Sequence, residues 1–143
     1  MLYAIADLHL SLGTNKPMDV FHGWQDYVER LEKNWKLIVK DEDTVVIAGD
    51  ISWAMRINNA YSDFKFIDEL PGQKVILKGN HDYWWSTKNK VINYLHDNGF
   101  NSISILFNSS YVVPPFAICG TRGWSYDCSS SDDIKVLNRE VGR

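Results

Sequence analysis

The chain is poor in cysteine, in long apolar runs and in basic charge. Its 143 residues include two cysteines, Cys119 and Cys128, which are too few for a disulfide framework. We expect no signal peptide, and no apolar run approaches the roughly 18 residues that a membrane span needs. With 15 basic and 18 acidic residues, the net charge of −3 argues against general nucleic-acid binding, which stays a rival interpretation. These absences favour a cytoplasmic protein whose partners are neither membranes nor nucleic acids.

Composition and organisation both predict one globular domain. Hydrophobic residues make up 45% of the chain and charged residues 23%, which are ordinary values for a globular protein. No internal repeat, linker or charge block divides the sequence. Residues 1–143 are therefore expected to form a single domain or one piece of a domain, with enough chain for one hydrophobic core.

Alternating strand and helix patterns predict a parallel sheet in the N-terminal two thirds of the chain. Short runs rich in Val, Ile and Leu are typical of parallel strands covered on both faces. These runs are Leu2–Ala6, Thr44–Ala48 and Lys74–Leu77. Apolar residues at three-to-four spacing predict the helices between them. Those helices begin near Trp24, near Ile57 and at a cap formed by Ser86 or Thr87.

The last third of the chain has a different character. Ser102–Phe107, Tyr111–Val113 and Phe116–Cys119 are short apolar segments separated by turn residues, a pattern that predicts antiparallel strands. The loop Gly120–Ser131 follows them. A final helix is predicted from Asp132 to the end of the chain.

Polar residues that can bind a metal follow each of the three predicted parallel strands. They are Asp7 and His9 after the first strand, Asp50 after the second, and Asn80, His81 and Asp82 after the third. Ligands gather at the carboxyl ends of strands in open α/β sheets because several loops converge there. The three segments are therefore expected to form one site.

These residue types suit a centre of two divalent metal ions. Asp50 could bridge two cations roughly 3.5–4 Å apart. Oxygen and nitrogen ligands without thiolate favour manganese, with iron or zinc as alternatives. Asn80 would add a neutral oxygen, which leaves the site positive and attractive to an anionic substrate. His81 could protonate an alkoxide leaving group, and Asp82 could orient the His81 ring.

Three motifs carry a resemblance to a known family: Asp7-Leu8-His9, Gly49-Asp50 and Gly79-Asn80-His81-Asp82. In this order they resemble the signature of the calcineurin-like metallophosphoesterases. The stretches Gly49–Met55, Lys78–Trp85 and Gly120–Trp124 are also similar to a bacterial branch of predicted phosphohydrolases. The resemblance implies an α/β fold, a four-layer α/β/β/α sandwich, of which this chain is the N-terminal portion, truncated at its C-terminal end.

The resemblance also implies a role for each site residue. Asp7 and His9 would bind the first metal ion, Asp50 would bridge the two ions and Asn80 would bind the second. His81 would be the catalytic histidine, contacting substrate in place of metal. The expected reaction is hydrolysis of a phosphate mono- or diester carried by a small molecule, a nucleotide or a protein.

Histidine is absent from the last third of the chain, where the family has further metal ligands. The resemblance implies an isolated His and a Gly-His-x-His segment there, yet no histidine follows His96. Trp53 stands where some members have an Asp, so orientation of the catalytic histidine falls to Asp82. A second hypothesis is therefore a catalytically silent fragment that binds one metal weakly or serves as an interaction unit. A third is a homodimer in which the partner chain completes the site.

Side chains beside the motifs have competing interpretations. Asn80 and Arg122 are candidates for binding the substrate phosphate, although a structural salt bridge explains Arg122 equally well. Trp53, Trp84 and Trp85 could line a pocket for an aromatic substrate. Aromatic residues beside a strand edge more often belong to the core.

Overall fold

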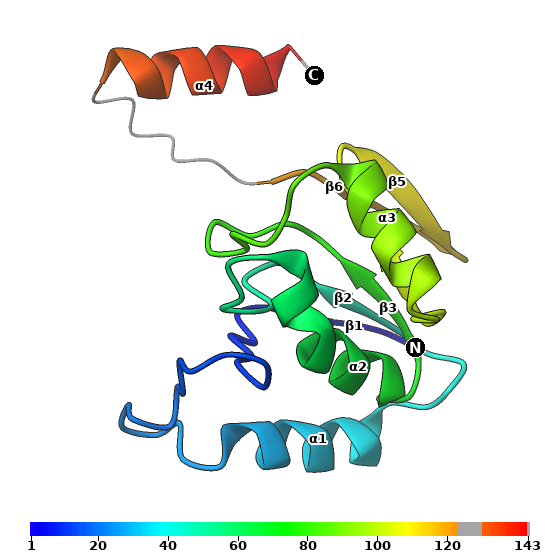
Figure 1. Ribbon diagram of the computed structural model, residues 1–143. Helices are drawn as coiled ribbons and strands as arrows, with labels where there is room; N and C mark the ends of the chain where they lie inside the picture. Colours follow the sequence, from blue (N-terminus) through cyan, green and yellow to red (C-terminus); the bar gives the residue numbers. More distant parts are fainter. Residues whose placement is uncertain (123–129, 143) are drawn as a thin grey trace.

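The computed structural model describes residues 1–122 and 130–142, so Gly123, Trp124 and Cys128 lie outside the described residues. The strands are β1 (Leu2–Ile5), β2 (Thr44–Ile47), β3 (Gln73–Ile76), β4 (Ile103–Ile105), β5 (Ser109–Val113) and β6 (Phe116–Gly120). The helices are α1 (Tyr27–Ile38), α2 (Tyr61–Glu69), α3 (Lys88–Asp97) and α4 (Ser131–Val141), with a 3₁₀ turn η1 (Ile57–Ala60) directly before α2 (Figure 1). Among these described residues, no helix is long and apolar enough to cross a membrane.

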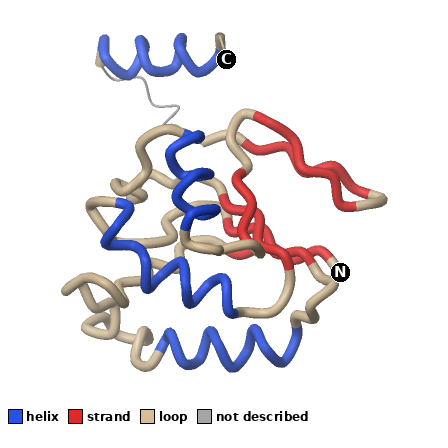
Figure 2. Tube along the Cα trace, turned by 45° about the vertical axis from the view of Figure 1, so that its right-hand side comes forward, coloured by secondary structure: helices blue, strands red, loops and turns tan. Residues whose placement is uncertain are grey.

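The first sheet is parallel, and its strand order β1-β2-β3-β4 follows the sequence. A right-handed crossover between neighbouring parallel strands places its helix on a fixed side of the sheet. Consequently α1, α2 and α3 cover the same face, as Figures 1 and 2 show. The predicted α/β class, the three parallel strands and the helices between them are confirmed.

The fourth strand corrects the prediction for Ser102–Phe107. We expected antiparallel pairing there, but β4 runs parallel to β3, with Lys74 opposite Ile103 and Ile76 opposite Ile105. The physical reason is α3, which carries the chain back across the sheet so that the next strand runs in the same direction. The antiparallel pairing predicted for the two following strands is confirmed, since β5 pairs with β6 in a separate sheet.

The hydrophobic core lies between the first sheet and the three helices. Ile47 of β2 and Phe64 of α2 are fully buried. Trp35 of α1 and Leu95 of α3 close the two sides of the core. The core thus fixes the three helices against the strands whose ends carry the candidate site.

One face of β1 departs from the expectation that every strand is covered on both faces. Leu2 and Ala4 are exposed there, whereas Val75 of the interior strand β3 is fully buried. The reason is the strand order, which puts α1, α2 and α3 on the other side. The β5–β6 sheet lies near the β3–β4 side, because a Cβ added at Gly120 would lie 2.7 Å from the Leu77 side chain.

Candidate metal centre

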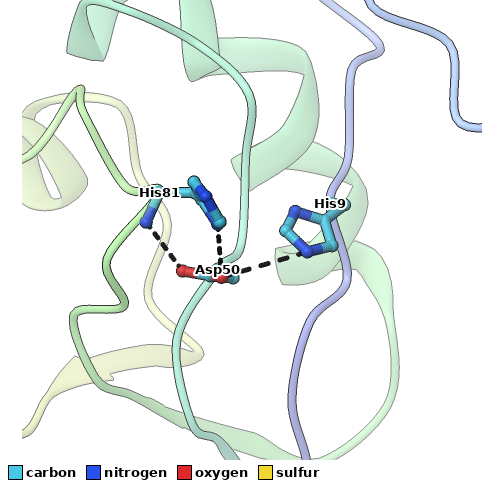
Figure 3. A group of neighbouring side chains, drawn as sticks. All are labelled: His9, Asp50 and His81. Atoms are coloured by element: carbon cyan, nitrogen blue, oxygen red, sulfur yellow. Dashed lines mark hydrogen bonds and ion pairs between the residues drawn. The ribbon is translucent and has the colours of Figure 1, made fainter. Parts of the chain in front are cut away.

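The ends of β1, β2 and β3 bring together three of the predicted site residues. One donor atom each of His9, Asp50 and His81 lies within 4.8 Å of the others. Figure 3 shows the two imidazole rings on either side of the Asp50 carboxylate. Asp50 occupies the middle because β2 lies between β1 and β3 in the sheet.

Asp50 is the centre of the hydrogen bonding in this group. It accepts the His81 backbone N–H at 2.9 Å, and its other oxygen lies 2.9 Å from the His81 ring Nδ1. Its side chain is 9% exposed. Burial raises the pKa of this carboxyl, but the His81 hydrogen bonds and the charges of His81 and His9 outweigh burial and hold the pKa below its usual value. Asp50 is therefore an anionic donor at neutral pH.

Asp7 extends the group toward solvent. Its oxygen Oδ1 lies 3.6 Å from His9 Nε2, and its side chain is 64% exposed. His9 Nε2 lies 3.9 Å from Asp50 Oδ2. Two ligands that each lie about 2.1 Å from one ion are separated by at most about 4.2 Å. The His9–Asp7 and His9–Asp50 pairs each meet this limit, whereas the three donors that lie within 4.8 Å of one another are those of His9, Asp50 and His81. Their oxygen and nitrogen donors suit manganese, iron or zinc.

The backbone of these three residues adopts a conformation that side chains disfavour. Asp7, His9 and Asp50 have φ of 57°, 46° and 51°. Such left-handed residues other than glycine cost of order 1–3 kcal/mol each and cluster at functional sites. Backbone bonds hold them in place, with Asp7 donating to Gly49 O at 3.1 Å and His9 donating to Asp50 O at 2.9 Å. The fold thus maintains strain at the predicted metal ligands.

Asp82 is a buried anchor beneath the group. Five N–H groups donate to it at 2.8 to 3.3 Å: the backbone N–H groups of Asp50, Ile51, Ser52 and Gly79 and the indole Nε1–H of Trp84. Burial raises the pKa of Asp82, and these hydrogen bonds offset part of that effect. The orienting contact to the His81 ring that we predicted for Asp82 is made by Asp50.

Two glycines allow the loops after β2 and β3 to approach each other. Gly49 has φ of 99°, and a Cβ added there would lie 2.6 Å from the Gly79 backbone. A Cβ at Gly79 would collide with the Asp50 side chain. A larger residue at Gly49 would displace the loop after β3, and one at Gly79 would displace Asp50.

A second buried carboxylate, Asp63 of α2, supports the loops from the helical side. It accepts the Leu12 N–H at 2.7 Å and the Ser52 hydroxyl. Burial raises the pKa of Asp63. Leu12 follows His9 and Ser52 follows Asp50, so Asp63 joins both donor loops to α2. Asp63 was not among the predicted site residues, although its position on the apolar stripe of α2 was a signal for it.

The two predicted substrate contacts lie around His81 and Lys78. The Asn80 side-chain nitrogen is 3.1 Å from His81 Nδ1 and 3.3 Å from Nε2. Arg122 follows β6. Lys78 is the residue before Gly79. Burial is the main cause that lowers the pKa of Lys78, and the positive charge of Arg122 lowers this pKa further. The second sheet thus brings Arg122 toward the loop that carries His81.

Aromatic rings surround the two histidines. Trp53 stacks on His9, with ring centroids 4.9 Å apart and an interplanar angle of 18°, and its centroid is 5.1 Å from that of His81. Trp24 lies on the other flank, 6.4 Å from His9 between centroids. The apolar spacing predicts a helix that begins near Trp24, but Trp24 precedes α1 and lies beside the site. The two other tryptophans near the motifs are core residues: Trp84 and Trp85.

Comparison with known proteins identifies the class to which this fold and site belong. The chain matches the calcineurin-like phosphoesterase family over residues 2–141, and it belongs to that family. An uncharacterized protein of Methanocaldococcus jannaschii is 30% identical over 109 residues, which cover 73% of this chain and 57% of that protein. The crystal structure of a protein of unknown function from Aquifex aeolicus shares the fold, with a TM-score of 0.52 and 20% identity, covering 99% of this chain and 71% of the other.

Family membership defines the general chemistry of the site. The family is one of calcineurin-like phosphoesterases, whose general chemistry is the hydrolysis of phosphoric esters. His9, Asp50 and His81 could hold a metal ion for that chemistry. The chain spans 57% of the length of its curated relative.

Proposed function

We propose that the protein is a phosphoric ester hydrolase with a centre of two divalent metal ions, preferentially manganese, with iron or zinc as alternatives. The main support for this proposal is the group of His9, Asp50 and His81 at the strand ends. The chain that carries this group belongs to a phosphoesterase family. In this proposal Asp7, His9 and Asp50 would hold the first ion, and Asp50 and Asn80 would hold the second. The bound ions would activate water and offset the negative charge of the phosphate.

His81 is the proposed general acid. Its ring Nδ1 contacts the Asp50 carboxylate, and its side chain is 39% exposed. A hydrogen bond at one imidazole nitrogen fixes the tautomer and leaves the other nitrogen for substrate. In this proposal His81 acts as an imidazolium: Nδ1–H donates to Asp50, the Nε2 proton passes to the leaving-group oxygen, and neutral His81 remains. Asn80 and Arg122 donate N–H groups to phosphate oxygens.

The proposed substrate is a phosphate mono- or diester of a small molecule, a nucleotide or a protein. The net charge of −3 supports small anionic esters over general nucleic-acid binding. We place the reaction in the cytoplasm. A homodimer is the proposed assembly if a partner chain supplies further ligands.

Hydrolysis of p-nitrophenyl phosphate and bis(p-nitrophenyl) phosphate by the manganese-loaded protein tests this proposal. Asp50→Asn and His81→Ala are each expected to lower the rate by at least about 100-fold. His96→Ala removes a histidine that is 85% exposed and is expected to leave the rate unchanged. Equal rates in the wild type and in both site variants would contradict the proposal.

A metal-binding chain without hydrolytic activity is the second candidate function. It is favoured by the absence of histidine after His96 in this sequence. Calorimetric titration with Mn²⁺ distinguishes the two candidates. A hydrolase is expected to bind two ions per chain. A silent chain is expected to bind one ion weakly, and it should release no nitrophenol from the two test esters. Activity that rises faster than linearly with protein concentration would indicate a site completed in a homodimer.

A further inference from the structure

We propose that the cavity between the end of β1 and the start of α1 binds a planar aromatic group on the alcohol side of the substrate, with Trp24 as the recognition surface. This inference rests on the proposed hydrolase function. The cavity has a volume of about 240 Å³. Its lining includes Asp7, Trp24, Tyr27, Arg30, Leu31 and Asn34.

The cavity lies beside the candidate metal centre, next to Asp7. Asp7 lines the cavity, and its carboxylate lies 3.6 Å from His9 Nε2. The Trp24 ring lies 6.4 Å from the His9 ring between centroids. A phosphate bound to a metal ion at Asp7 and His9 would therefore have the cavity as the adjacent space for the group attached to its ester oxygen.

Trp24 is held in position before any ligand binds. Its backbone N–H donates to Phe21 O at 3.1 Å, and its carbonyl accepts the Tyr27 N–H at 3.2 Å. The Trp24 and Tyr27 rings meet edge to face with centroids 5.2 Å apart. The Tyr27 hydroxyl donates to the His9 carbonyl at 2.9 Å, which ties this aromatic pair to the metal loop. A preorganised ring loses little conformational freedom when a ligand packs on it.

The cavity lining favours an aromatic group over an alkyl chain. Trp24 and Tyr27 offer ring surfaces, and aromatic pairs gain attraction beyond the area that they bury. Arg30 and Asn34 of α1 supply a few polar groups, as is typical of ligand sites with an apolar wall. Trp53, by contrast, is already stacked on His9 and carries the Lys16 ammonium 4.8 Å from its ring centroid. Trp24 is therefore the recognition residue of the two.

Two phosphonates that cannot be hydrolysed provide the test. Calorimetric titration of the manganese-loaded protein compares phenylphosphonate with methylphosphonate, and we expect the phenyl compound to bind about tenfold more tightly. Trp24→Leu is expected to reduce that preference below about twofold. Tyr61→Leu removes an aromatic residue on α2 that is 44% exposed and is expected to keep the preference.

If Trp24→Leu is destabilised, Trp24→Tyr provides a second test. Tyrosine keeps an aromatic ring at this position, so this variant should retain most of the preference for phenylphosphonate. Equal affinities of the wild type for the two phosphonates overturn the proposal, as do the absence of binding and an unchanged preference in Trp24→Leu. A phenyl preference without hydrolysis of p-nitrophenyl phosphate supports the cavity and contradicts the hydrolase. Hydrolysis of p-nitrophenyl phosphate without a preference for phenylphosphonate supports the hydrolase and contradicts the cavity proposal.

Discussion

The Asp82 carboxylate oxygen Oδ2 lies 2.9 Å from the backbone nitrogen of Asp50 and accepts its N–H. The same oxygen accepts the Gly79 N–H at 2.8 Å. One buried carboxylate thus joins the loop after β2 to the loop after β3. Because Asp50 is the central donor of the candidate metal group, the position of that donor depends on Asp82.

Replacing Asp82 with asparagine tests this dependence. Asp82→Asn is expected to lower the free energy of unfolding by about 2–3 kcal/mol, because the amide NH₂ faces N–H donors and leaves a buried N–H without an acceptor. Asp132→Asn makes the same chemical change at a side chain that is 84% exposed and should cost less than about 0.5 kcal/mol. Urea unfolding measures both. Equal losses in the two variants would show that the anchor is dispensable.

Two substitutions at Asp7 separate its role as a ligand from its backbone strain. Asp7→Ala and Asp7→Gly both remove the carboxylate, so both are expected to weaken manganese binding by at least about tenfold. Glycine tolerates the φ of 57° that alanine does not. The glycine variant should therefore be about 0.5–1 kcal/mol more stable than the alanine variant without metal. Calorimetry and thermal unfolding measure the two effects, and equal stabilities would argue against strain at Asp7.

Manganese is expected to stabilise the folded chain. At a free concentration 100 times its Kd, an ion that binds only the folded state adds about 2.7 kcal/mol to the free energy of unfolding. For a chain of this size the melting temperature should rise by about 5–11 °C, and a chelator should reverse the rise. His9→Ala is expected to lose most of the shift, whereas His96→Ala, at an exposed position, should keep it. A full shift in His9→Ala would contradict its assignment as a ligand.

Lys74 predicts a rise of stability with pH. It is fully buried in β3, where its ammonium donates to the carbonyls of Leu70 and Asp68. Burial lowers the pKa of Lys74 from 10.5 to about 8. Between pH 8 and 10.5, Lys74 is protonated to a greater extent in the unfolded chain than in the folded chain. Stability from this group is therefore present above pH 10.5 and is lost as the pH falls through about 8, a change of about 3 kcal/mol.

Urea unfolding at pH 7.5 and at pH 10 measures the effect of Lys74. Lys74→Met is expected to show a much smaller rise, because methionine fills similar space without a titratable group, and only the lowered pKa of Lys78 then contributes. Lys65→Met changes a lysine on α2 that is 55% exposed, and it should rise with pH as the wild type does. A rise in Lys74→Met as large as that of the wild type would contradict the prediction.

Local patterns were sufficient to predict most of the secondary structure. The runs Leu2–Ala6 and Thr44–Ala48 are apolar enough to identify strands, and Thr87 does cap α3, accepting the Lys90 N–H at 3.4 Å. The pairing of Ile103–Ile105 could not be predicted in the same way, because an apolar run does not specify the direction of its partner. That direction follows from the crossover through α3.

The candidate site was predictable to the extent that its residues follow strands. His9, Asp50 and His81 were expected to meet, and the strand order explains why they do. The partners of Asp82 were not predictable, because the same carboxylate could have reached the His81 ring or the backbone beneath it. Its burial among five N–H donors decided between them. The buried position of Asp63 was likewise visible only once α2 was packed against the two loops.

The amino-acid sequence by itself determined the order of the first strands and helices, the family and the strand-end residues that can bind metal. These properties depend on local spacing and on motifs within a few residues. Only the tertiary structure decided that Asp50 lies between His9 and His81, that Asp82 joins two loops and that Trp24 lines a cavity beside Asp7. Such relationships connect residues far apart in the chain, and their distances arise from the strand order and from the packing of loops against the helices.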